Sequence, residues 1–137
     1  MHTPIEFYLV FPVDLYRRGE QGRLKLDYVR THPPRKAEEV WDVEIKNGLV
    51  QKESGGISTF NRPNAKFGVW WYRIPKGTPL PDGLHLSKDH TDGDFRGHYT
   101  IRPFTNMTLD AFKAKLKLLG ESAVPAFLAS DNKENRA

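Results

Sequence analysis

The sequence predicts an α+β domain built on largely antiparallel sheets. Many short runs of aromatic and β-branched residues are separated by turns rich in glycine and proline, which is typical of strands. Two longer segments carry apolar residues at helical spacing, and they do not alternate with the strands as βαβ units would. Because the 137-residue chain has no internal linker, residues 1–129 are expected to form a single domain, with a disordered polar tail over 130–137.

The first half of the chain is predicted to contain a strand and a helix. Residues 6–17, EFYLVFPVDLYR, are rich in β-formers and predict a strand interrupted at Pro12. Residues 31–45 are predicted as a helix, because two prolines suit its first turn and an apolar stripe follows at helical spacing. That stripe consists of Ala37, Val40, Trp41 and Ile45.

The second half is predicted to contain most of the strands and a second helix. Short strands are expected at 57–60, 69–75, 84–88 and 98–104, of which 69–75 has aromatic residues on both faces and is expected to be buried on both sides. The segment 108–120 predicts a helix with Thr108 as N-cap and Gly120 as C-terminal cap. Its apolar face is expected to pack on the sheet and consists of Leu109, Phe112, Leu116 and Leu119.

The last strand places a histidine beside a tyrosine. In GHYTIRPF, Tyr99 and Ile101 share one face and are expected to point into the core, because successive side chains alternate along a strand. His98, Thr100 and Arg102 then share the opposite face. From the residues alone this face is either solvent or a cleft, so His98 is either a surface histidine or part of a site.

Several function classes are excluded by what the sequence lacks. There are no cysteines, which rules out disulfides, a thiol nucleophile and cysteine-ligated metal sites. His85 and His90 lie near Asp89 and Asp92, but they straddle a strand end and a loop with no regular geometry, so these residues are expected to be solvated rather than to bind a metal. We expect neither a classical signal peptide nor membrane insertion. The net charge of +4 is spread along the chain, which permits contact with nucleic acid without predicting it.

An ordered series of motifs resembles one family. FPVDLYR, NGLVQKESGGISTFNRPN, YRIPKGTPLPDGL and HYTI, followed by a helix containing methionine, cover roughly residues 11–119. In this order they resemble the ADP-ribosyltransferase-like toxins typified by a type VI secretion effector, with bacterial and fungal relatives. The resemblance implies an ADP-ribosyltransferase-like fold of two packed, mainly antiparallel sheets with a few flanking helices. It also implies a cytotoxic, NAD-dependent mono-ADP-ribosyltransferase that acts inside a target cell, has NAD as substrate and has a cognate immunity protein as partner.

The same resemblance assigns roles to particular residues. Arg17 matches the arginine that holds a phosphate of NAD, and Arg62 is a weaker candidate for a phosphate contact. Ser58 and Thr59 match the residues that brace the cleft and hydrogen-bond either the nicotinamide ribose or the arginine. His98 takes the place at which classical transferases carry their catalytic glutamate, while Tyr99 is expected to be a packing residue.

The absence of a glutamate from the HYTI strand leaves the reaction open. A neutral imidazole cannot offset a developing positive charge as a carboxylate does, but it can act as a general base. Asp92 or Asp94 in the preceding loop is a candidate source of the missing negative charge. Two alternatives therefore stand beside the transferase: an RNA-directed toxin such as a ribonuclease, and a binding module that kept the fold and lost the chemistry. The acceptor of the ADP-ribose group and the specialised secretion route are left unspecified by the sequence.

Overall fold

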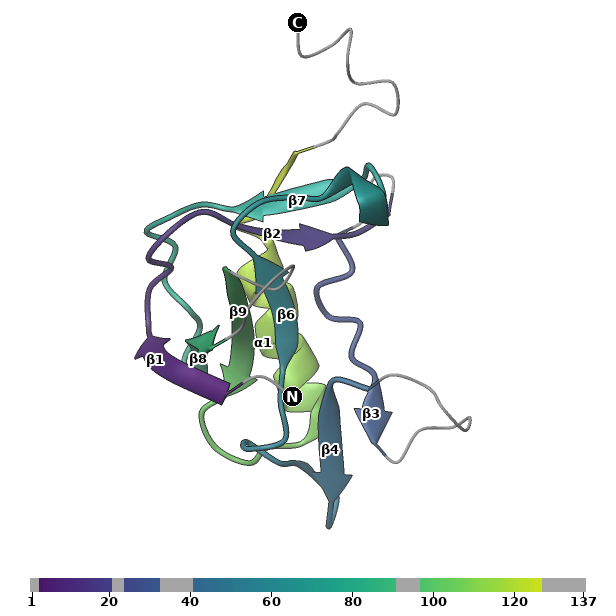
Figure 1. The fold of residues 1–137 in the computed structure, drawn as a ribbon. Helices are drawn as coiled ribbons and strands as arrows, with labels where there is room; N and C mark the ends of the chain where they lie inside the picture. Colours follow the sequence, from purple (N-terminus) through teal and green to yellow (C-terminus); the bar gives the residue numbers. More distant parts are fainter. Residues whose placement is uncertain (1–2, 21–23, 33–40, 91–96, 127–137) are drawn as a thin grey trace, which may run out of the picture.

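The computed structural model describes residues 3–20, 24–32, 41–90 and 97–126 (Figure 1). Within these ranges the chain forms ten strands, one 3₁₀ turn and one α-helix. The elements are β1 (Thr3–Tyr8), β2 (Leu15–Arg18), β3 (Thr31–His32), β4 (Val43–Lys46), β5 (Leu49–Val50), β6 (Ile57–Phe60), η1 (Ala65–Phe67), β7 (Trp71–Ile74), β8 (Leu84–His90), β9 (His98–Pro103), α1 (Leu109–Gly120) and β10 (Val124–Pro125). None of the described helices is long and apolar enough to cross a membrane.

A bent, seven-stranded antiparallel sheet forms the body of the molecule. Its strand order is β1-β8-β9-β6-β2-β7-β10. β6 and β2 are joined by the single residue pair Tyr16–Phe60, and beyond this point β2 and β7 run across the end of β6 and β9 (Figure 1). A smaller sheet has the order β3-β4-β5, in which the turn at Asn47 and Gly48 has positive φ at both residues, as a tight hairpin requires. The predicted α+β class with mainly antiparallel sheets is consistent with this architecture.

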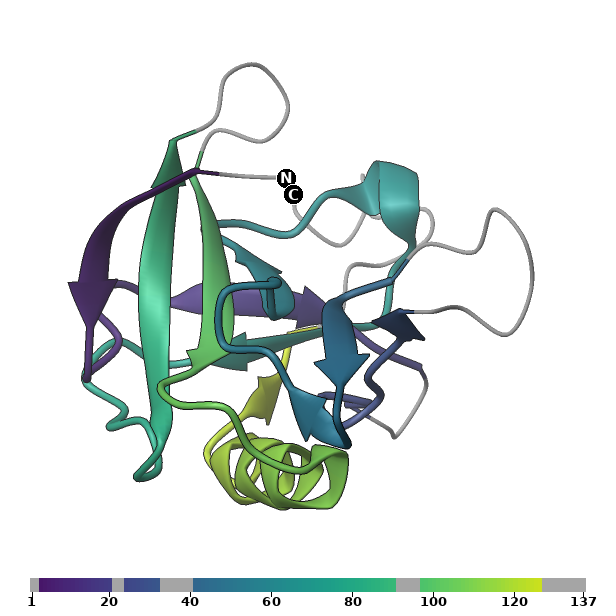
Figure 2. The same ribbon diagram turned by 90° about the horizontal axis from the view of Figure 1, so that it is seen from below.

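The helix α1 covers the apolar face of the sheet. Phe112, Leu116 and Leu119 are buried and pack in the same cluster as Ile57 and Ile101 of the neighbouring strands β6 and β9. Figure 2 shows the helix lying beneath the strands, with β1, β8 and β9 side by side. The predicted packing face of the helix is therefore confirmed, and it leaves the opposite face of β6, β9 and β8 available for other groups.

The predicted N-cap of α1 is confirmed, but the predicted C-terminal cap is not. Thr108 is the N-cap, as expected, and its hydroxyl accepts a hydrogen bond from the Ala111 amide at 3.1 Å. Gly120, however, is the last residue of the helix rather than a cap beyond it, and Glu121 takes the cap position. A Cβ at Gly120 would lie 3.1 Å from Leu24 Cδ2, so the lack of a side chain at this position allows Leu24 to pack closely against the end of the helix.

The helix predicted over 31–45 is wrong in its described parts. Thr31–His32 and Val43–Lys46 are strands, and Thr31 pairs in parallel with Val43. The β-branched residues Val43 and Ile45 favour a strand, and pairing with β3 and β5 outweighs the local helical spacing. Residues 33–40, which hold the rest of the predicted helix, lie outside the described residues, as does the tail over 130–137. Instead of a few flanking helices, the described part of the chain has α1 and the short turn η1.

The strands that were expected in the second half are confirmed. Trp71, Tyr72 and Ile74 of β7 are buried, so this strand has packed side chains on both faces. β8 runs to His90 and is longer than predicted, because Pro4 of β1 pairs with Asp89 and extends the ladder. Asp89, which was expected in a loop, therefore belongs to the sheet.

Candidate active site

Polar side chains line one face of the three central strands. The register pairs Thr100 of β9 with Ser58 of β6 on one side and with Ser87 of β8 on the other. His98 and Arg102 share this face with Thr100, as the alternation along the strand predicted. The surface alternative for His98 is wrong, because its side chain is only 2% exposed in the fold. The sheet thus presents a row of buried polar groups opposite α1.

Asp89 lies at the centre of this row. Its Oδ2 is 2.6 Å from His98 Nδ1 and also accepts a hydrogen bond from the Thr100 hydroxyl. Its Oδ1 accepts a hydrogen bond from the Ser87 hydroxyl at 2.9 Å and lies 3.7 Å from Arg102 Nη2. Arg102 Nε in turn donates to Ser87 Oγ at 2.8 Å. The Asp89 side chain is 0% exposed, so these neighbours take the place of water.

This network determines the charge on Asp89 and the proton on His98. Burial by itself would raise the pKa of Asp89, but the hydrogen bonds from His98, Thr100 and Ser87 outweigh it and lower the pKa. The carboxylate is therefore ionised and can only accept hydrogen bonds. Nδ1 of His98 must then carry a proton, and in the neutral ring the lone pair lies on Nε2.

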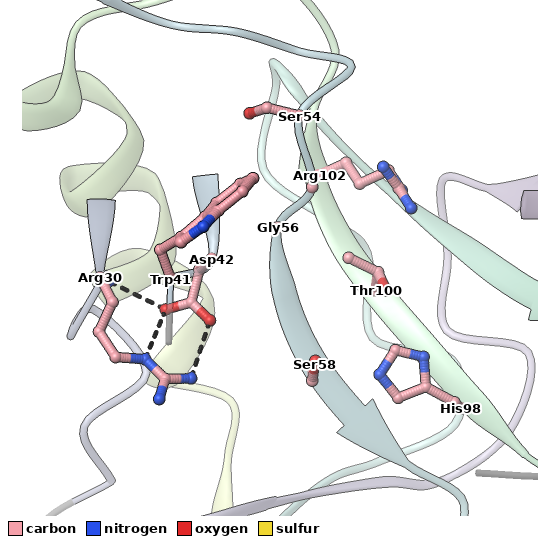
Figure 3. A pocket seen from close by; sticks show the side chains of 10 residues that line it. Arg30, Trp41, Asp42, Ser54, Gly56, Ser58, His98, Thr100 and Arg102 are labelled. Carbon is pink, nitrogen blue, oxygen red and sulfur yellow. Dashed lines mark hydrogen bonds and ion pairs between the residues drawn. The ribbon is translucent and has the colours of Figure 1, made fainter. Parts of the chain in front are cut away.

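A pocket of about 350 Å³ opens beside this polar face. Figure 3 shows Ser58 and His98 projecting from neighbouring strands into the same space, with Arg30, Trp41 and Asp42 on the opposite side. The lining residues come from four segments that are distant in sequence: Arg30, Trp41, Asp42, Ser54, Gly55, Gly56, Ser58, His98, Thr100 and Arg102. A volume near the lower end of the range for small-molecule sites fits part of a nucleotide-sized ligand.

Two glycines allow the walls of the pocket to approach each other. A Cβ at Gly55 would lie 2.3 Å from the Asp42 carbonyl oxygen, and φ at this glycine is +140°. A Cβ at Gly56 would lie 2.1 Å from the carbonyl oxygen of Ile101. Any other residue in these positions would push β6 away from β9 or from the segment before β4. The Gly-Gly pair in ESGGIST is therefore a geometric requirement of the site.

An ion pair forms the wall opposite His98. The guanidinium of Arg30 donates from Nη2 to Asp42 Oδ1 at 3.0 Å and from Nε to Oδ2 at 3.3 Å, and the Arg30 amide also donates to Oδ2. Such a two-pronged contact holds the guanidinium plane in a fixed orientation. The pocket is thus flanked by two guanidinium groups, Arg30 on this wall and Arg102 on β9.

Arg17 lies next to the pocket on β2. Its Nη1 donates to the Ser58 carbonyl oxygen at 2.8 Å, which ties it to a residue that lines the pocket. Among the described residues, its buried Nε has no hydrogen-bond partner. Burial lowers the pKa of Arg17, Asp42 raises it, and the nearby Arg30 and Arg18 lower it. Since arginine stays protonated in proteins, this buried cation and its cationic neighbours favour an anionic ligand.

The match with a family model decides the identity of this fold and pocket. Residues 13–126, which include every residue that lines the pocket, match the model of the Tse2 ADP-ribosyltransferase toxins. The chain belongs to the Tse2 ADP-ribosyltransferase toxin family. This confirms the resemblance carried by the motifs, whereas no curated protein matches the sequence. The family places the toxin in the ADP-ribosyltransferase class.

The structure brings only some of the predicted site residues of this toxin together. Ser58 and His98 line the pocket, and Arg17 contacts Ser58. Thr59 does not reach it, because its side chain points into the core on the other face of β6 and its hydroxyl donates to the Tyr99 carbonyl at 3.0 Å. Arg62 is exposed in the loop after β6 and is not one of the lining residues. Tyr99 is buried among core residues, as expected.

The structure adds residues that the sequence did not single out. Asp89 was expected in a solvated loop, although His85, Ser87 and Asp89 alternate with Leu84 and Leu86, and this alternation is the signal that could have extended the strand. Arg30 and Asp42 gave no such signal, because they meet only when the chain has folded. The described residues contain no group of three or more potential metal ligands. Asp92 and Asp94, the suggested sources of negative charge, lie outside the described residues.

Proposed function

We propose that this toxin is an NAD-dependent mono-ADP-ribosyltransferase that acts inside a target cell. The observation that carries this proposal is the pocket in which a serine hydroxyl and a buried histidine stand between guanidinium groups. Delivery by a specialised secretion route and neutralisation by a cognate immunity protein belong to the same proposal, on the strength of the family. The acceptor is a target molecule or water.

The residues around the pocket fit the chemical groups of NAD. The guanidinium groups of Arg17 and Arg30 suit its phosphates, since arginine donates hydrogen bonds in a planar fork and stays charged. The Ser58 hydroxyl suits the hydroxyls of the nicotinamide ribose. Trp41 contributes an aromatic wall against which a planar ring can stack. Arg62 keeps a role in this proposal only as an outer phosphate contact, and Thr59 is left out because it is turned into the core.

His98 is the residue proposed to act in the chemical step. Breaking the bond between nicotinamide and ribose develops positive charge on the ribose, and an acceptor must then attack the same carbon. The strand of His98 has no glutamate, so stabilisation by a carboxylate in direct contact is not assigned to it. A neutral histidine at this position takes a proton from the attacking acceptor and so acts as general base, which is typically worth about 10²- to 10⁴-fold in rate.

The RNA-directed alternative loses one of its supports. Aromatic residues on a strand can stack on RNA bases, but Trp71 and Tyr72 of β7 are buried in the described fold. Stacking of single-stranded RNA requires exposed aromatic faces. The alternative therefore rests on the basic charge of the chain and on histidines other than the buried His98, and it is retained here only as an outcome of the test.

Binding and consumption of NAD by the purified toxin test the proposal. We expect calorimetry to detect NAD binding by wild-type toxin, and Arg17→Ala to abolish it. We expect His98→Ala to bind NAD and to release nicotinamide at a rate lower by about 10²-fold or more. A toxin that kills cells but neither binds nor consumes NAD would overturn the proposal and direct attention to RNA cleavage. Toxicity that survives both substitutions would indicate a binding module without catalysis.

A further inference from the structure

Asp89 has a position that neither packing nor ligand binding explains. It is a buried carboxylate with three hydrogen-bond donors and a nearby guanidinium, yet it is not one of the residues that line the pocket. An apolar residue in the same place would need none of these partners, and a buried charge of this kind is weak evidence for stability. Three of its partners, His98, Thr100 and Arg102, do line the pocket. Asp89 therefore acts on the pocket through these side chains, and His98 is the one among them that can serve as a base.

We propose that Asp89 is the positioning residue of the active site: it holds His98 in the tautomer with Nδ1 protonated, so that Nε2 takes the proton of a hydroxyl acceptor. This proposal rests on the transferase function proposed above. The geometry supports it in two ways. The 2.6 Å contact fixes the plane of the ring, and the Thr100 and Ser87 hydroxyls hold the carboxylate itself in place. An orienting carboxylate of this kind sets which nitrogen of a histidine carries the lone pair.

The proposed step names the chemical class of the acceptor. The acceptor oxygen forms a bond to C1′ of the nicotinamide ribose, and the bond from C1′ to nicotinamide breaks. Nicotinamide leaves as a neutral molecule, and the hydroxyl proton goes to Nε2 of His98. A hydroxyl needs this base because it must lose its proton as it attacks, whereas an anionic nucleophile attacks without one. The site is thus suited to hydroxyl acceptors, either water or a hydroxyl of a target molecule.

The tautomer of His98 can be measured without any reaction. In a two-bond ¹H–¹⁵N correlation spectrum of the wild-type toxin with neutral histidines, we expect His98 to show a protonated Nδ1 and an unprotonated Nε2. The signal is assigned by its absence from His98→Gln. In Asp89→Asn we expect His98 to populate both neutral tautomers, because the amide has one acceptor oxygen where the carboxylate has two. Asp82→Asn, which lies in an exposed turn, is the control and should leave the His98 tautomer unchanged. If the neutral His98 ring of the wild type is protonated on Nε2 instead, the proposal is overturned. This result comes from the wild-type spectrum, so it can be obtained even if Asp89→Asn does not fold.

The acceptor class is tested with three nucleophiles of known chemistry: water, methanol and azide. We expect Asp89→Asn and His98→Ala to slow nicotinamide release to water or methanol by about 10²- to 10⁴-fold, with the KM for NAD close to that of the wild type. Azide, which needs no base, should restore release in both variants to within about tenfold of the wild-type rate. Asp82→Asn should behave as wild type throughout.

The outcomes separate this proposal from the function on which it rests. Equal loss with all three nucleophiles would mean that Asp89 serves only the structure, and would overturn the proposal. Release of nicotinamide by the wild type with azide but not with methanol or water would contradict the assignment of hydroxyl acceptors. If the wild type releases no nicotinamide with any of them, the proposed function fails, while the spectrum still decides whether Asp89 sets the tautomer. With labelled NAD, label on free ADP-ribose would identify water as the acceptor, and label on a macromolecule would identify a hydroxyl of a target molecule.

Discussion

Replacing Thr100 with valine tests how the buried carboxylate of Asp89 is stabilised. Valine has nearly the shape of threonine, so the change removes the hydroxyl that donates to Asp89 and leaves no cavity. Hydrogen bonds to charged groups contribute about 1.5–3 kcal/mol each to stability. Asp89 keeps its contacts with His98 and Ser87 in the variant. We therefore expect Thr100→Val to lower the free energy of unfolding by about 1.5–3 kcal/mol at neutral pH.

This loss should depend on pH in a defined direction. The fold lowers the pKa of Asp89 below its ordinary value of 3.8, so the stability from its ionised form is present above that value and is lost as the pH falls through the folded pKa. Removing the Thr100 donor moves the folded pKa back up. The difference in stability between wild type and variant should therefore be greatest near neutral pH and should shrink at pH values below 3.8.

The assay is urea denaturation at neutral pH and at about pH 3, with Thr59→Val as matched control. Thr59 is an equally buried threonine on the neighbouring strand, but its hydroxyl donates to a backbone carbonyl rather than to a carboxylate. Thr59→Val should cost about 0.5–1.5 kcal/mol, with no dependence on pH. If Thr100→Val costs no more than the control, or costs the same at both pH values, then the Thr100 hydroxyl does not stabilise the ionised carboxylate of Asp89.

Three further substitutions test the phosphate contact, the close approach of strands and the core. Arg17→Lys keeps the charge but loses the planar fork, so calorimetry should show NAD affinity lower by about tenfold or more; unchanged affinity would remove Arg17 from the site. Gly56→Ala should lower the free energy of unfolding by about 1–3 kcal/mol and reduce the rate of nicotinamide release, because the added Cβ would collide with the Ile101 carbonyl of β9. Gly48→Ala, where the added Cβ has open space, should leave the release rate unchanged. Leu116→Ala should cost about 2–5 kcal/mol in urea denaturation, and the exposed Leu118→Ala less than about 0.5 kcal/mol.

Strand alternation was enough to predict one half of the active site. The pattern HYTI places Tyr99 and Ile101 on one face, and the fold confirms that His98 lies on the other. The alternation could not show that this second face is covered. His98 is buried because Asp89 of β8 and the Phe60 ring of β6 come to lie beside it, and these contacts form only when the strands pair.

The remaining parts of the site depend on contacts between distant segments. Asp89 looks like a loop residue, since charged and glycine-rich sequence follows it, and only pairing with β1 keeps it in a strand. Residues 31–45 have helical spacing, but pairing of Thr31 with Val43 makes their described ends strands. Arg30 and Asp42 are likewise brought to the pocket by this pairing. Local sequence patterns do not encode such contacts, because they are decided by packing in the whole domain.

The proposed transfer of ADP-ribose from NAD by means of His98 can be followed with a label. The most direct test is transfer of label from adenine-labelled NAD in a cell extract, with wild type beside His98→Ala. We expect wild type to consume NAD and to attach label to an acceptor, or to release labelled ADP-ribose where water is the acceptor, and we expect His98→Ala to do neither at a comparable rate. A toxic preparation that leaves the NAD intact would rule out the transfer, and a His98→Ala variant that transfers label as fast as wild type would rule out the role of His98.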